Sequence, residues 1–125
     1  MPFSYRVEPS SGFLMSTWSG RITAEDLGRF WKDVLSDPAI VGCGRGLTDL
    51  RQAQIAFTGS ELGDLVDGVV RPLLAGRPWR AAILAGAPAQ YGTARQFEVF
   101  AQGVTDHAIF TDEETAIAWL VEEDM

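Results

Sequence analysis

The segment LTDLRQAQIAFTGSEL, residues 47–62, contains the pattern that decides the fold. Its first four residues predict a short strand over 47–50, and the polar residues that follow predict a turn. A helix is expected from Thr58, because Thr58 and Glu61 have the spacing of a capping box, in which each side chain bonds the backbone N–H of the other residue. The segment therefore predicts a strand, a turn and a helix, which is the repeating unit of a parallel α/β sheet.

The residues before this segment predict a hairpin and a first helix. Alternating apolar and polar residues over 3–8 predict a half-buried strand. The turn sequence PSSG follows, and residues 13–19 are then expected to form the second, antiparallel strand of a hairpin. The stretch ITAEDLGRFWKDVLSDP predicts a helix that Thr23 caps and that ends before Pro38, because the residue before a proline avoids the helical region. The glycine-rich residues 41–46 are expected to form a loop.

The residues after the segment predict further strands and helices. The helix from Thr58 extends to about residue 75, and Pro72 is expected to kink or shorten its last turns. Residues 79–86 are nearly all apolar, which predicts a central strand covered on both faces. Three more elements follow, namely a helix over about 89–102, a strand over 107–110 and a helix over 112–123 capped by Thr111 or Asp112. The inner face of the 89–102 helix is expected to carry Tyr91, Ala94, Phe97 and Ala101.

This order, β-β-α-β-α-β-α-β-α, predicts a single α/β domain over residues 1–125. The sheet is expected to be mixed, with about five strands, an N-terminal antiparallel hairpin followed by parallel βα units, and about four helices.

Composition and charge narrow the classes of partner. The chain has 125 residues and a formal net charge of −7, and an acidic surface repels phosphate backbones, so nucleic acid is not an expected partner. One cysteine cannot form an intrachain disulfide, and no apolar run approaches the roughly 18 residues of a membrane span. We therefore expect a cytoplasmic protein without a membrane span.

Four motifs resemble the bacterial SpoIIAA-like family of the STAS superfamily, named for sulfate transporters and anti-sigma-factor antagonists. They are GRIT at 20–23, LTDLRQ at 47–52, AQYGTARQF at 89–97 and IFTDEETAIAWL at 109–120. The resemblance covers nearly the whole chain and implies a SpoIIAA-like, STAS-like fold and a regulatory or binding role without catalysis. The family is also compared with CRAL-TRIO lipid-binding domains, which implies an alternative role as carrier of a small apolar or lipid-like ligand.

The resemblance also implies two candidate phosphorylation sites. In the anti-sigma-factor antagonists, a partner kinase phosphorylates a serine at the start of the helix after the middle strand. Thr58 is closest to that position and Ser60 is the second candidate, although Phe57 stands where the family has an aspartate. A phosphate there would meet free N–H groups and the positive end of the helix dipole. The alternative is a plain helix cap.

Two pairs of residues are candidates for binding a ligand or a partner. Asp49 and Arg51 are expected at the carboxyl end of a strand, the edge where open α/β sheets bind ligands; alternatively Asp49 bonds loop amides and Arg51 is its exposed neighbour. Tyr91 and Arg95 follow the small-residue turn AGAPAQ, where a helix start could hold an anion. A tight turn with Tyr91 packed is the alternative.

The sequence offers no recognised catalytic or metal-binding pattern. His107 is the single histidine, and a general base needs a nucleophile and an orienting partner nearby, although Asp49 could converge on it in space. Cys43 lies between glycines, with Arg45 as its only basic neighbour. One histidine and one cysteine exclude the usual zinc sets, so no metal, cofactor or enzymatic activity is expected.

Two functions follow from these observations. The first is a non-catalytic binding or regulatory module of STAS type that meets a protein partner through helix starts near Asp49, Thr58 and Tyr91. The second is a carrier of a small apolar ligand, which predicts a cavity of a few hundred Å³ beside the third helix. Phe30, Trp31, Phe97 and Phe100 could line such a pocket, or simply pack together. A homodimer through an exposed first strand is a further expectation.

Overall fold

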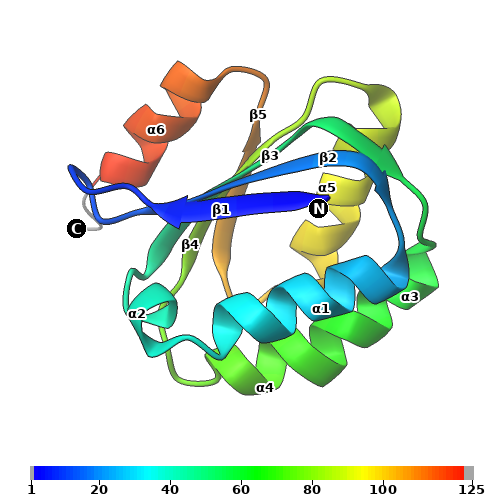
Figure 1. Ribbon diagram of the computed structural model, residues 1–125, viewed down its shortest axis with the longest axis horizontal. Helices are drawn as coiled ribbons and strands as arrows, with labels where there is room; N and C mark the ends of the chain where they lie inside the picture. The colour runs from blue at the N-terminus through cyan, green and yellow to red at the C-terminus, as the bar shows by residue number, and fades with distance from the viewer. Residues whose placement is uncertain (1, 123–125) are drawn as a thin grey trace.

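The structure is a computed structural model and describes residues 2–122 (Figure 1). Its strands are β1 (Phe3–Val7), β2 (Leu14–Ile22), β3 (Arg45–Ile55), β4 (Arg80–Leu84) and β5 (Asp106–Phe110). Its helices are α1 (Ala24–Leu35), α2 (Pro38–Val41), α3 (Gly59–Leu65), α4 (Arg71–Leu74), α5 (Pro88–Phe100) and α6 (Glu113–Val121), with a π-helical turn η1 (Val66–Val70) that joins α3 to α4.

The five strands form one mixed sheet in the order β1-β2-β3-β4-β5. β1 runs antiparallel to β2, and every later pair of neighbours is parallel. Crossovers between parallel strands are right-handed, so this consecutive order puts α1, α3–α4 and α5 on one face of the sheet. α6 lies on the other face (Figure 1). The predicted fold class is confirmed.

Each face of the sheet has its own apolar core. The larger core joins the three crossover helices to the sheet through residues such as Ile22, Leu27, Leu50 and Val66. The smaller core lies under α6 and comprises Phe13, Leu47, Ala82, Leu84, Ala116 and Leu120. Leu47 and Leu50 of β3 are three residues apart and belong to the cores on opposite faces, because side chains alternate between the two faces along a strand.

The predicted loop over 41–46 is wrong at both ends. Pro38 ends α1 as expected, but it also begins α2, which runs to Val41 and adds a helix to the predicted four. A proline is favourable in a first helical turn because its missing N–H would have no partner there, and Asp37 caps this turn by accepting from Ala39 N at 3.0 Å. The next strand begins at Arg45.

The strand predicted over 47–50 is longer, and the turn predicted after it does not exist. β3 continues to Ile55, and its second half pairs with β2 from Ser19↔Gln52 to Ile22↔Ile55. The residues that indicated a turn, Arg51, Gln52 and Gln54, are exposed strand positions. A polar strand of this kind resembles a loop in sequence because one of its faces meets solvent.

The helix that begins after Thr58 passes through Pro72 to Leu74 without stopping. Pro72 has no N–H to donate to the carbonyl four residues earlier, and its ring needs room on that side. The helix widens instead, so that the N–H of Arg71 bonds the carbonyl of Val66, five residues back. The expected disturbance is therefore a π-helical turn just before the proline.

The inner face predicted for α5 is wrong at one position. Tyr91 is 45% exposed, whereas Gln90 is buried and takes the inner position in line with Ala94 and Ala101. At the end of the chain, Asp112 caps α6 by accepting from Thr115 N at 2.9 Å, and the predicted end at residue 123 lies outside the described residues. Among residues 2–122, no helix combines the length and apolar character needed to cross a membrane.

Candidate functional site

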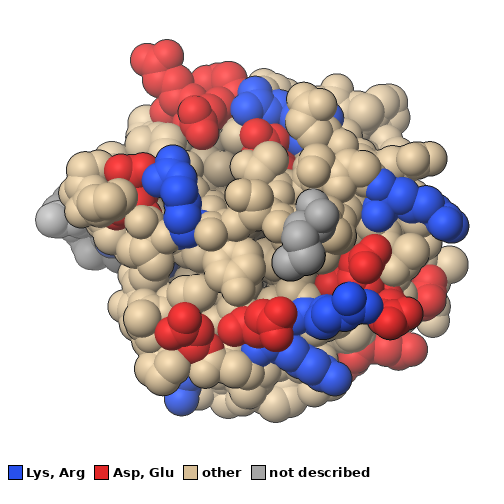
Figure 2. Space-filling model, viewed as in Figure 1, with Lys and Arg blue, Asp and Glu red and all other residues tan. Residues whose placement is uncertain are grey.

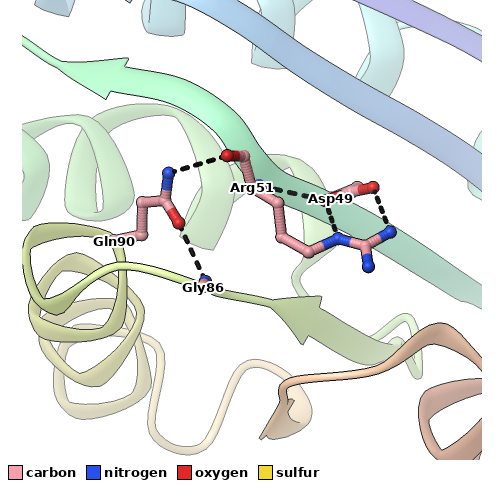
Figure 3. A network of polar contacts seen from close by, with 4 residues as sticks. All are labelled: Asp49, Arg51, Gly86 and Gln90. Carbon is pink, nitrogen blue, oxygen red and sulfur yellow. Dashed lines mark hydrogen bonds and ion pairs between the residues drawn. The ribbon is translucent and has the colours of Figure 1, made fainter.

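Polar groups gather where β3 runs past the end of β4. β4 ends at Leu84, opposite Asp49, while β3 continues to Ile55 and leaves carbonyls without a strand partner on that side. The Gln90 side chain replaces the missing strand, because its Nε2 donates to Arg51 O at 3.2 Å (Figure 3). The same nitrogen also donates to Ala53 O at 3.0 Å. Gln90 therefore ties the start of α5 to the free edge of β3.

The other end of the Gln90 amide caps α5. Its Oε1 accepts from Gly86 N at 2.8 Å and from Ala87 N at 2.9 Å, and the residue at the cap position, Ala87, has no polar side chain of its own. Two of the N–H groups that could have received an anion are therefore already bonded. All four hydrogen-bonding positions of this buried amide are filled. The sequence pattern missed Gln90 because apolar periodicity does not select an amide.

Asp49 and Arg51 form a local pair on one face of β3. The Asp49 carboxylate accepts from Arg51 N and Nε at 3.0 Å each and from the second guanidinium nitrogen at 2.9 Å (Figure 3). Burial works to raise the pKa of Asp49, but the hydrogen bonds and charge of Arg51 outweigh it and hold this pKa below its usual value. The bonds to Asp49 raise the pKa of Arg51, with small contributions from Asp112 and Glu113. The charge and the hydrogen-bonding groups of Asp49 are therefore matched by Arg51 without a ligand.

Tyr91 and Arg95 lie on α5 beyond this network. Arg95 pairs with Glu98 of the same helix, at 3.8 Å between Nε and Oε1, and both Arg95 and Tyr91 are exposed. The structure thus joins Asp49 and Arg51 to Gln90, while Tyr91 and Arg95 form the outer surface next to them.

Thr58 and Ser60 are exposed at the start of α3. Thr58 Oγ1 accepts from Glu61 N at 3.1 Å, and Glu61 Oε1 accepts from Thr58 N at 2.9 Å, which confirms the predicted capping box. Phe57 and Leu62 stand at the positions of a hydrophobic staple, and both line the cavity described below. The residue that replaces the family's aspartate is thus used in packing.

His107 and Asp49 do not meet. His107 is near the start of β5, points to the same face as Ile109, and its Nδ1 hydrogen-bonds Thr105 Oγ1 at 2.7 Å. Asp49 is in register with the last residues of β4 and β5 and shares a face with Leu47, on the α6 side. The two side chains are therefore at opposite ends and on opposite faces of the sheet.

Cys43 has the properties of an ordinary thiol. Burial, with the charge of Asp37, raises the pKa of Cys43, and its Sγ donates to Ala39 O at 3.4 Å. The described residues contain no group of three or more His, Cys, Asp or Glu side chains placed to hold a metal ion. On the face drawn in Figure 2, acidic and basic side chains are interspersed over the surface.

An apolar cavity of about 100 Å³ lies between the sheet and the helices α1, α3–α4 and α5. Phe30, Trp31 and Phe97 line the cavity, in agreement with the interpretation of these residues as the lining of a pocket. Phe100 instead packs over Gly63 of α3. Its walls include Ala81 of β4 and Ala94 of α5, whose small side chains leave the space open. The cavity lies beside the predicted helix but is smaller than the few hundred Å³ expected.

Comparison with known proteins bears on the fold. No family model matches the sequence. No curated protein matches it either. Among solved structures, the chain is similar to an uncharacterised protein of the DUF3478 family from Shewanella loihica PV-4, solved with a SpoIIAA-like fold. The two share 19% sequence identity and a TM-score of 0.61 over 94% of this chain and 93% of the other. The chain has a SpoIIAA-like fold.

This likeness shows the fold alone, so the function has to be argued from the chain's own residues. Two regions of the structure are candidates for binding a ligand, and they differ in whether their own side chains already fill them. The polar network around Gln90 is satisfied internally, whereas the cavity is apolar space that its own side chains leave unfilled.

Replacing Gln90 by leucine is expected to destabilise the protein by about 2 kcal/mol or more. The substitution leaves two N–H groups and two carbonyls without the partner that Gln90 provides. Urea unfolding measures the change, and Gln102→Leu, at an exposed glutamine just after the same helix, is the control, with a change within about 0.5 kcal/mol. Equal stability of the two variants would contradict the role assigned to Gln90.

Asp49→Asn is expected to reduce stability at pH 7 by about 1 kcal/mol. Because the pKa of Asp49 is lowered in the folded state, its contribution is fully present above the unfolded pKa and disappears as the pH falls through the folded pKa. The difference from the natural sequence in urea unfolding should therefore begin to shrink as the pH falls below the unfolded-state pKa of about 3.9. A difference of the same size at pH 7 and pH 3 would show that the carboxylate charge is not its cause.

Proposed function

We propose that this chain is a non-catalytic binding module and that its ligand is a small apolar molecule held in the cavity of about 100 Å³ under the helical face. The cavity is the single observation that supports this proposal. Protein interiors are normally packed without spaces of this size, and a dry apolar cavity of about 150 Å³ is known to bind benzene.

The composition of the walls supports an apolar occupant. The lining residues are aliphatic and aromatic side chains with three threonines, and none of them is charged. Transfer of an apolar molecule from water to such a site is favourable by about 25 cal/mol per Å² of buried surface. The cavity is partly open to the surface, so the apolar end of a longer molecule also fits this description.

Ala81→Val tests this proposal because it fills part of the cavity. Ala81 is half-buried in β4 and lines the space, whereas Ala108 is half-buried at a neighbouring strand and points to the α6 side. We expect benzene to raise the melting temperature of the natural sequence and of Ala108→Val, and Ala81→Val to weaken benzene binding about tenfold.

The same comparison applies to the natural ligand. Native mass spectrometry of the protein purified from its own host should show a bound small molecule, which Ala81→Val reduces and Ala108→Val retains. A bare mass together with no response to benzene would refute the carrier function.

A second function, engagement of a protein partner, is supported by the exposure of several candidates at one edge. Thr58, Ser60 and Tyr91 are exposed and follow the carboxyl ends of β3 and β4. A Cβ added to Gly59 would lie 2.8 Å from Gln96, so the start of α3 lies against the second half of α5. A phosphate on Thr58 would disrupt its capping box, because it would stand beside the Glu61 carboxylate.

The phosphorylation version of this second function predicts label transfer to Thr58. A kinase from the same host should label the natural sequence and Ser60→Ala, and should not label Thr58→Ala. Label retained by Thr58→Ala and lost in Ser60→Ala would assign the site to Ser60, and no label with any host kinase would refute the switch.

Two further expectations stay predictions. β1 lies at the edge of the sheet with Tyr5 and Val7 exposed, which supports a homodimer through this edge. The single cysteine supports a cytoplasmic location.

A further inference from the structure

A second, wider pocket lies beyond one wall of the cavity. This outer pocket has a volume of about 510 Å³ and is lined by residues 43–45, 78–80 and 103–106, where the chain enters β3, β4 and β5. Trp79 and Thr105 line both the outer pocket and the apolar cavity, and no other described residue does so. The partition between the two spaces is therefore one residue thick at this place.

The two spaces differ in polarity. None of the described residues that line the cavity is charged, whereas Arg45, Arg80 and Asp106 belong to the wall of the outer pocket. The outer pocket is also more open to solvent, so a polar group there keeps contact with water. An apolar group is therefore favoured in the cavity, and a polar group is favoured in the outer pocket.

Trp79 is held less firmly than the other two tryptophans of the cavity wall. Trp18 and Trp31 are 6% and 8% exposed, and their rings contact Phe30 and Phe97 respectively. Trp79 is half-buried, and within residues 2–122 its indole makes no ring contact and no hydrogen bond. Packing alone therefore keeps the Trp79 side chain in its place.

The surroundings of Trp79 leave its ring able to turn. A Cβ added to Gly46 would lie 3.0 Å from Cζ2 of Trp79, so the ring lies over a position of β3 that has no side chain. Residues 75–78, which lead to Trp79, are exposed. Thr105, by contrast, is held by its hydrogen bond with His107 at 2.7 Å. Of the two residues in the partition, Trp79 is the one whose side chain can move aside.

We infer that the ligand of this chain is an amphiphile, whose uncharged apolar end fills the cavity and whose polar end lies in the outer pocket, and that Trp79 turns aside to admit it. The inference rests on the proposed carrier function and deepens it by naming the chemical class of the ligand and a second subsite. A ligand of this kind can exceed the volume of about 100 Å³ that the cavity alone offers.

Two probes that share an aromatic ring test the inference on the natural sequence. Benzene has no polar end, and hydrocinnamyl alcohol joins the same ring to a short chain that ends in a hydroxyl. In a ¹H–¹⁵N spectrum, both probes should shift the amide signal of Ala94, which lines the cavity. Only the alcohol should shift the amide signals of Gly44 and Gly103, which line the outer pocket and not the cavity.

The single cysteine allows the outer pocket to be blocked. Cys43 lines the outer pocket and not the cavity, so a maleimide adduct at Cys43 should weaken the alcohol relative to benzene about tenfold. The matched control is the same adduct on Ser60→Cys in a Cys43→Ser background. Ser60 is exposed at the start of α3, near Phe57 and Leu62 of the cavity wall, and its adduct should leave the ratio of affinities unchanged.

Trp79→Ala tests the role of the partition. Apparent affinity falls in proportion to the fraction of molecules that can bind, so removal of a ring that has to turn aside should strengthen the alcohol relative to benzene about fivefold. Phe57→Ala is the control, because Phe57 is also a half-buried aromatic residue that lines the cavity but not the outer pocket. An unchanged ratio in Trp79→Ala would overturn the role assigned to Trp79.

The outcomes separate this inference from the carrier function. If both probes bind and the alcohol shifts no signal of the outer pocket, the inference is overturned and the carrier function stands. An effect of the Ser60→Cys adduct in place of the Cys43 adduct would show that the polar end leaves the cavity beside α3, which also overturns the inference. Failure of both probes to bind refutes the carrier function and the inference with it.

Discussion

The hand of the crossovers between parallel strands is the constraint on which the rest of this structure depends. β2 to β5 follow one another in the sheet in chain order, so each right-handed crossover returns over the same face. One face therefore receives α1, α3–α4 and α5, and only α6 remains to cover the other. Because the cover is unequal, the protein has a large core with a cavity on the face of the three crossovers and a smaller core under α6.

The cavity follows from the way in which the helical layer is packed. Neighbouring helices approach closely at glycines, because a Cβ at Gly28 would meet Leu65 at 3.2 Å and one at Gly63 would meet Phe100 at 3.2 Å. Close lateral packing fixes the helices to one another, while small residues such as Ala81 and Ala94 face the space between helices and sheet. Helices that are held to one another in this way cannot move onto the sheet to fill the space beside Ala81 and Ala94.

The parts of the fold that local chemistry determines could be predicted from the sequence, and the parts that depend on distant partners could not. Thr23, Thr58 and Asp112 cap helices through residues three positions away, so their patterns are visible in the sequence. The extension of β3 to Ile55 depends on β2, far away in the chain, and its polar residues looked like a turn. Gln90 was missed for the same reason, because the carbonyls that it bonds belong to β3 and not to its own helix.

The distribution of polar and apolar groups in the fold bears on what each region can do. At the carboxyl edge of the sheet, where α/β proteins often bind ligands, Asp49, Arg51 and Gln90 use their hydrogen-bonding positions on one another and on the backbone. General acid–base catalysis needs a titratable group within reach of a nucleophile, and the register of the sheet keeps Asp49 and His107 apart. The space that the fold leaves unfilled is lined without charged side chains among the described residues, so it can hold an apolar molecule but offers no titratable group that could move a proton.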